Sequence, residues 1–220
     1  MSEEKYWISI ADSDVLLWID GIVSALNLDL IVNEPDISPL AIQGPKSELL
    51  ASKVFGSKIS KLKLFDIDSF NFEGEKLLVA KSGYSKQGGY EIHVDNIKAG
   101  LELYDHLFEV GRKYNIKPGA PNHAERIEGG LLSYGNDMLI SDNPFECGFE
   151  KHVHLNSDVE FLGKEQLKKI KSEGIKRKLM GVKIDTDKIS VTGSMNLTDE
   201  KNNIFMSGPV SEIKNIKVEI

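Results

Sequence analysis

The clearest alternation of apolar and polar residues surrounds residues 81–94, KSGYSKQGGYEIHV. A loop with several glycines joins two apolar alternating runs there, the first over residues 76–80, and the pattern predicts two strands. Successive side chains of a strand point to opposite faces. In the second run the apolar side chains share one face and the polar ones the other: Tyr90, Ile92 and Val94 against Glu91 and His93. If the apolar face is the core, Glu91 points away from it.

The rest of the chain shows helix-like and strand-like patterns in succession. Apolar residues at helical spacing predict helices over residues 15–26, 44–54, 99–114, 121–135 and 163–171. Short apolar runs predict strands over residues 5–11, 28–32, 40–43, 145–155 and 179–184. Residues 61–72 are interpreted as a connector, and the turn-rich end after residue 184 predicts further short strands.

Composition and charge narrow the class of protein. With 220 residues, 40% hydrophobic and 28% charged, the chain is typical of a globular protein with one or two cores. A net charge of -7 argues against binding to a nucleic-acid backbone, which usually needs a basic face. No apolar run approaches the ~20 residues needed to cross a bilayer, and no signal-like segment begins the sequence. We therefore expect a cytoplasmic protein with no membrane or nucleic-acid partner.

Few residues suggest metal or thiol chemistry. Cys147 is the single cysteine, which excludes an intrachain disulfide and favours a buried structural thiol. His152 and His154 lie two residues apart on a predicted strand, but no third ligand is near them in the sequence. They are interpreted as surface histidines, and no metal site is predicted.

Glu91 is the most informative polar residue. A carboxylate on a rigid strand accepts two parallel N–H bonds from a planar donor, such as an arginine side chain or the 2-amino-pyrimidinone end of a pterin. The alternative is a solvated glutamate, since acidic residues are mostly exposed. The rings of Trp7 and Tyr84 are candidates for binding a cationic ligand through cation–π attraction. The spacing of Trp18 favours core packing.

Six stretches of the sequence carry a further signal: LAIQGPK (40–46), SGYSKQGGYEI (82–92), ERIEGGLLSYGNDM (125–138), NPFECGF (143–149), FLGKEQL (161–167) and LMGVKI (179–184). Taken together and in this order, they resemble the tetrahydrofolate-dependent aminomethyltransferase family, which includes the T-protein of glycine cleavage. Three segments are more similar to the dimethylsulfoniopropionate (DMSP) demethylases of this family than to the T-protein, namely SKQGGYE, PNHAERIE and DNPFECGF. The T-protein typically carries an Arg-Asp pair where this chain has Asn122 and His123.

The resemblance implies methyl transfer from the DMSP sulfonium to N5 of tetrahydrofolate. The alternatives are an aminomethyltransferase and a non-catalytic folate-binding relative. It also implies Glu91, Tyr84, Tyr90 and Arg126 as cofactor-binding residues and Trp7, Tyr84 and His93 as substrate-binding residues. Glu128, Tyr134 and Asn136 match the same motif, with helix-packing or loop-anchoring roles equally open. The partners would be a small sulfonium substrate and folate, and a homodimer stays open as an assembly.

The same resemblance implies an α+β fold with mixed or antiparallel sheets flanked by helices, followed by the start of a C-terminal β-barrel. We expect three domains: an incomplete α/β domain over residues 1–75, a folate-site α+β domain over 76–172 and a shortened β domain over 173–220. Beside the family the chain looks short at both ends. We therefore expect little activity from the chain by itself.

Overall fold

The computed structural model describes residues 4–10, 14–120, 123–181, 193–198 and 204–210. The chain separates into two compact units, Asp14–Leu131 and a second unit made of Met1–Ser13 with Leu132–Ile220. The predicted boundary at residue 75 falls beside a turn between two paired strands, so residues on both sides of it share one sheet. Each unit is described by itself.

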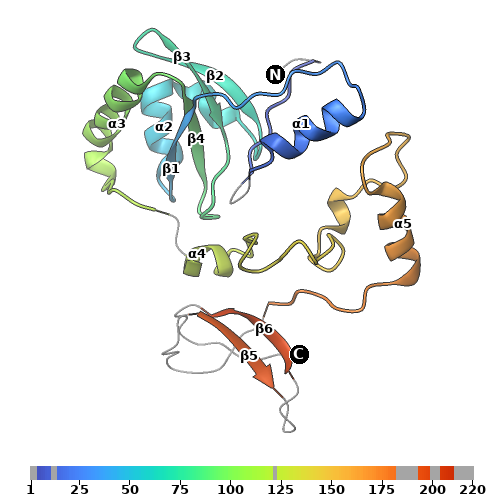
Figure 1. Cartoon of the computed structure of the whole chain (residues 1–220). Coiled ribbons are helices and arrows are strands. Elements are labelled where there is room, and N and C mark those ends of the chain that lie inside the picture. The colour runs from blue at the N-terminus through green and yellow to red at the C-terminus, as the bar shows by residue number, and fades with distance from the viewer. Residues whose placement is uncertain (1–3, 11–13, 121–122, 182–192, 199–203, 211–220) are drawn as a thin grey trace. The chain divides into compact units, whose positions relative to one another are not determined.

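A four-stranded antiparallel sheet forms the first unit (Figure 1). Its strands are β1 (Ser38–Gln43), β2 (Ile67–Phe72), β3 (Glu75–Ala80) and β4 (Gly89–Val94), in the spatial order β1-β4-β3-β2. Glu73 and Gly74 join β2 to β3 with positive φ angles of 47° and 90°, as a tight two-residue hairpin requires. The strands predicted at residues 40–43 and 76–80 are confirmed, and the α+β class with an antiparallel sheet is confirmed with them.

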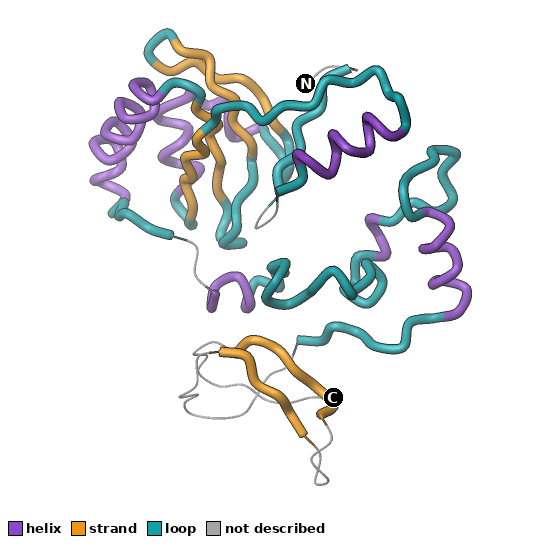
Figure 2. The backbone as a smooth tube through the Cα atoms, in the orientation of Figure 1, coloured by secondary structure: helices purple, strands orange, loops and turns teal. Residues whose placement is uncertain are grey.

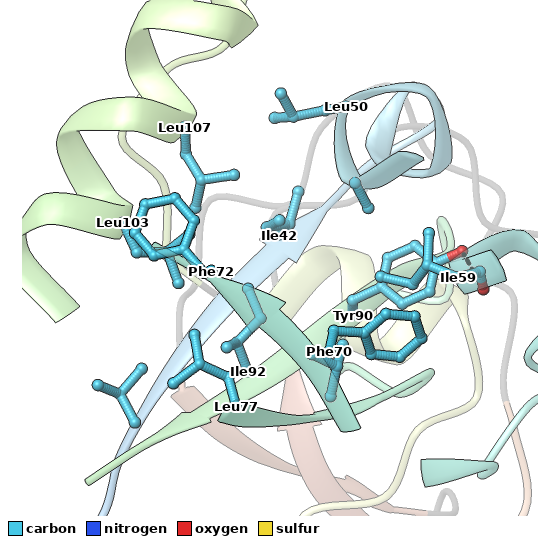
Figure 3. Packing of buried hydrophobic residues seen from close by; sticks show 13 residues of the cluster. Ile42, Leu50, Ile59, Phe70, Phe72, Leu77, Tyr90, Ile92, Leu103 and Leu107 are labelled. Atoms are coloured by element: carbon cyan, nitrogen blue, oxygen red, sulfur yellow. Dashed lines mark hydrogen bonds between the residues drawn. The ribbon is translucent and has the colours of Figure 1, made fainter. Parts of the chain in front are cut away.

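Two helices cover one face of this sheet. Both α2 (Ser47–Phe55) and α3 (Ile97–Gly111) pack on it and on each other, with the 3₁₀ turns η1 (Ser57–Lys61) and η2 (Arg112–Tyr114) beside them. Figure 3 shows the helix and sheet side chains meeting in one apolar cluster. Burial of such side chains, worth about 1.5–3 kcal/mol each, is the main stabilising term. The cluster contains Ile42, Leu50, Ala51, Ile59, Phe70, Phe72, Leu77, Val79, Tyr90, Ile92, Val94, Leu103 and Leu107.

The segment before the sheet differs from the sequence prediction. The helix α1 (Leu16–Ala25) is present, but residues 28–32 form neither helix nor strand, so the strand predicted there is wrong. Trp18 is 62% exposed and Ile31 is 96% exposed. The predicted core packing of Trp18 is therefore wrong as well, because only Val23 of this helix is buried.

A connector prediction and a strand prediction are also wrong. The presumed connector at residues 61–72 contains β2, whose Phe70 and Phe72 alternate into the core. The strand predicted over residues 5–11 is not formed in its described part, residues 5–10, apart from a bridge at Lys5, and Ala11 lies outside the described residues. Apolar alternation makes a strand only where a partner strand and a core are available.

Loops and turns dominate the region after α4 (His123–Glu128), as Figure 2 shows. The helix predicted over 121–135 ends early because Gly130 adopts a left-handed φ of 66°, a common helix-terminating conformation. Residues 145–155 form turns and the 3₁₀ helix η3 (Glu150–His152) in place of the predicted strand.

The second unit ends in the predicted helix and in a strand pair. Helix α5 (Lys164–Glu173) confirms the prediction at 163–171, and β5 (Gly193–Thr198) pairs with β6 (Ile204–Val210). Residues 179–181 form no strand, and the remainder of the strand predicted at 179–184 lies outside the described residues. The extension of β5 and β6 into a barrel stays a prediction.

A buried lysine holds the loop before α5 in place. Lys164 is only 4% exposed, and its ammonium donates to the backbone oxygens of Ser157 (2.8 Å) and Val159 (3.0 Å) and to the carboxylate of Glu160 (2.9 Å). Three acceptors satisfy the three N–H donors of an ammonium group, which makes its burial tolerable. Among the described residues, no helix is both long and apolar enough to cross a bilayer.

Candidate functional site

Glu91 stands on the face of the sheet that α2 and α3 do not cover. Its neighbours Tyr90 and Ile92 are fully buried in the core, so alternation turns Glu91 to the other side, where it is half-buried. The cross-strand partners of Glu91 are Ala41 on β1 and Ala80 on β3. Side chains that lie directly opposite share a face, so the carboxylate stands between two methyl groups. Small neighbours on both sides leave room beside the carboxylate.

A serine just after β3 contacts this carboxylate. The hydroxyl of Ser82 donates a short hydrogen bond to Oε2 of Glu91. An ionised carboxylate offers about four lone-pair sites, so one hydroxyl contact leaves sites for the two parallel N–H donors of a pterin edge. The residues present therefore fit that group. The contact of Ser82 was not predicted from the sequence. Ser82 comes close to Glu91 because Ala80 pairs with Glu91, and local patterns do not show which residues of β3 and β4 pair across the loop between them.

The loop between β3 and β4 is fastened to β1 by Gln43. The amide of Gln43 donates to the backbone oxygen of Ser82 (3.0 Å) and accepts from the hydroxyl of Ser85 (2.8 Å). A Cβ atom added at Gly83 would lie 2.0 Å from Oε1 of Gln43, and one added at Gly89 would lie 2.3 Å from its Nε2. Real Cβ atoms do not approach so closely. Both glycines are therefore needed to admit the Gln43 side chain between the two ends of the loop.

The other side of the same loop contacts α4. The ammonium of Lys86 donates to the backbone oxygen of Gly129 (2.5 Å), and the amide of Gln87 donates to the carboxylate of Glu125 (2.9 Å). A cation at the carbonyl end of a helix is electrostatically favoured. The loop thus links β1, β4 and α4 within one unit.

Arg126 supports this region from inside. It is 2% exposed, and its Nη1 donates to the backbone oxygen of Leu131 (3.2 Å), just beyond the end of α4. This contact orders the turn that follows the helix. The implied contact of Arg126 with a cofactor stays a prediction.

Tyr90 lies on the opposite side of the sheet from Glu91. Its side chain is fully buried in the core, with the hydroxyl 3.5 Å from the backbone oxygen of Ile59, as Figure 3 shows. Burial raises the pKa of the Tyr90 phenol, an effect that the ammonium of Lys81 opposes. A tyrosine in this position packs the sheet against η1 and does not share the face of Glu91. Its implied cofactor contact stays a prediction.

The three residues that the family resemblance implies as substrate-binding lie in different parts of the chain. His93 is half-buried on the same face as Glu91, between Pro39 and Leu78 on the neighbouring strands. Tyr84 is half-buried in the loop that contains Ser82. Trp7 is 37% exposed and belongs to the other unit. Their roles toward a substrate stay predictions.

Two residues of the later motif have local contacts. The side-chain amide of Asn136 donates to the hydroxyl of Ser133 (2.9 Å), and Tyr134 forms an isolated bridge with Met138. These contacts agree with the loop-anchoring alternative for this motif.

Cys147 and the two histidines show no reactive arrangement. Cys147 is half-buried, and burial, together with the nearby carboxylates of Asp142 and Glu146, raises the pKa of its thiol. His152 and His154 are exposed. Within the described part of the chain, no three histidine, cysteine or acidic side chains gather closely enough to hold a metal ion.

The sequence matches one protein family and is similar to a demethylase and to several aminomethyltransferases. Residues 1–157 match the family described as the GCVT N-terminal domain. Over 184 residues the chain is 41% identical to the dimethylsulfoniopropionate demethylase DmdA of Ruegeria pomeroyi, a match covering 84% of this chain and 50% of the relative. It is 32% identical over 186 residues to an aminomethyltransferase of Thermoanaerobacter sp., covering 82% of this chain and 50% of the relative. The chain thus spans about half the length of these curated relatives.

The fold is similar to a solved aminomethyltransferase. The crystal structure of the glycine cleavage system aminomethyltransferase T from Bartonella henselae superposes with a TM-score of 0.58 at 16% identity, over 86% of this chain and 52% of the other. That likeness shows a shared fold. Because the GCVT N-terminal domain matches well over half of the chain, and because the sequence relatives agree with it, the chain belongs to the aminomethyltransferase family.

Proposed function

We propose that this chain carries the pterin-binding carboxylate of a tetrahydrofolate-dependent methyltransferase that demethylates DMSP. The observation that carries the proposal is Glu91, which is held on a strand, faces away from the core, and stands between Ala41 and Ala80. Its carboxylate would accept the two parallel N–H bonds of the flat pterin edge. The family and the 41% identity to a DMSP demethylase support the choice of reaction.

The reaction requires neither a covalent nucleophile nor a metal ion from the protein, because the sulfonium carbon is already electrophilic and its leaving group departs as a neutral thioether. The lone pair of the folate N5 attacks the methyl carbon, the carbon–sulfur bond breaks, and its electron pair stays on sulfur. The sulfonium becomes the neutral thioether methylmercaptopropionate, while N5 releases its proton to water and becomes N5-methyl. The protein's contribution is then to bind the folate in a fixed orientation toward the methyl group, which lowers the barrier by several kcal/mol.

Binding of tetrahydrofolate is the first test. Calorimetric titration should show that Glu91→Gln weakens binding at least tenfold, because a neutral amide replaces a charge-assisted two-point contact. Glu102→Gln is the matched control, since Glu102 lies on α3 in an exposed pair with Lys98. Equal affinity of wild type and Glu91→Gln would remove Glu91 from the site.

The methyl donor is the second test. The protein is incubated with tetrahydrofolate and either DMSP or an aminomethyl-lipoyl donor, and the folate products are separated by chromatography. Formation of 5-methyltetrahydrofolate from DMSP supports the proposal. Transfer from the lipoyl donor alone supports the aminomethyltransferase alternative, which the 32% identity to an aminomethyltransferase favours. Because the chain spans about half the length of its curated relatives, folate binding with no turnover of either donor supports a binding module when a chain of the relatives' full length is assayed.

A further inference from the structure

Gln43 is the residue on which the loop beside Glu91 is built. It is half-buried at the end of β1, opposite Gly89 in the strand register, and it is not in direct hydrogen-bond contact with Glu91. Its amide bonds both Ser82 and Ser85, at two points of the same loop. A single side chain therefore joins the loop to β1 at two points.

The contact continues from Ser82 to the carboxylate. The backbone oxygen of Ser82 accepts from Gln43, and the hydroxyl of the same residue donates to Glu91. With its backbone held, Ser82 keeps its Cβ at a fixed distance from Glu91, and one of its staggered rotamers brings the hydroxyl to the carboxylate. The backbone N–H of Gly44 also donates to the oxygen of Gly88 (2.9 Å), which closes the far end of the loop onto β1.

We infer that Gln43 is a positioning residue for folate: it holds Ser82 so that the Ser82 hydroxyl fixes the orientation of the Glu91 carboxylate toward the pterin edge. The inference rests on the proposed folate binding at Glu91. It adds that the affinity of the carboxylate depends on a glutamine that does not touch the ligand. The close approach of Gln43 to Gly83 and Gly89 shows that the loop is shaped around this side chain.

A double-mutant cycle tests the inference. Gln43→Met keeps the length of the side chain and removes both hydrogen bonds, and it should weaken tetrahydrofolate binding about tenfold. In a Glu91→Gln background the same substitution should change affinity less than twofold, because the group that it positions is already lost. Gln87→Met is the matched control, since Gln87 is an exposed glutamine of the same loop that bonds Glu125. It should bind folate as the wild type does.

Amide hydrogen exchange without ligand provides a second measurement. Gln43→Met should speed exchange over residues 82–88 while leaving the buried amides of β4 protected, whereas Glu91→Gln should leave residues 82–88 nearly unchanged. A Gln43→Met variant that binds folate as the wild type does, or that loses the same factor in both backgrounds, overturns the inference. If Glu91→Gln binds as the wild type does, the proposed function itself fails. In that case unchanged exchange in Gln43→Met also refutes the loop-holding role.

Discussion

Gly89→Ala should destabilise the first unit strongly although it adds one methyl group. The new Cβ would lie 2.4 Å from the backbone oxygen of Ile42 and 2.3 Å from Nε2 of Gln43. The contact with Ile42 is about 1 Å shorter than ordinary van der Waals contact, and backbone oxygen in a strand cannot move aside alone. The φ angle of Gly89 is not positive, so alanine is tolerated by the backbone and the cost comes from the clash.

The magnitude follows from two contributions. Overpacking of this kind costs about 1–3 kcal/mol. Displacing Gln43 also loses two hydrogen bonds worth about 1 kcal/mol each, of which water replaces a part because the side chain is half-buried. We expect the free energy of unfolding to fall by about 3 kcal/mol, a large share of the stability of a typical domain.

Urea titration followed through the amide signals of Tyr90 and Ile92 reports this unit directly. Gly21→Ala is the control, because Gly21 lies inside α1 with nothing within 4 Å of its added Cβ, and it should stabilise by about 1 kcal/mol. A loss below about 1 kcal/mol in Gly89→Ala would show that the strand pair relaxes freely and would refute the reasoning.

Two further predictions concern a helix cap and the thiol. Asn96→Ala should lower the free energy of unfolding by about 1 kcal/mol in urea titration, because the Asn96 side chain caps α3 by accepting from the N–H groups of Lys98 (3.0 Å) and Ala99 (3.3 Å); no change would contradict the capping role. Alkylation of Cys147 by iodoacetamide should have its pH midpoint above that of a free thiol, because burial raises the thiol pKa. Arg177→Ala should move that midpoint higher still, since the guanidinium favours the thiolate, and a midpoint at or below an ordinary thiol would be inconsistent with this account.

The central sheet could be predicted where alternation coincided with burial. Tyr90, Ile92 and Val94 entered the core as their pattern indicated, and Glu91 faced away from it. Leu28 and Ile31 are as apolar as a strand residue, yet they are exposed and unpaired in the sheets described. A sequence pattern records that a residue suits a buried surface, and it does not record whether a partner strand is there to supply one.

Only part of the candidate site could be predicted from the sequence, for a similar reason. A carboxylate on a strand can be found from its neighbours in sequence, as Glu91 was. Ser82 and Gln43 come close to it only through the register of three strands, with Gln43 more than thirty positions away from the loop that it holds. Contacts of that separation follow from the fold, and local patterns carry no signal for them.

The two alanines beside Glu91 make the width of the site adjustable. Ala41 is exposed and Ala80 half-buried, and neither belongs to the apolar cluster that stabilises the sheet. Replacing either by valine would narrow the space around the carboxylate by two methyl groups, and β-branched residues suit strands. Selectivity among flat ligands of different breadth could thus be altered by evolution or by an engineer at little cost in folding, since the residues that set the gap are separate from those that form the core.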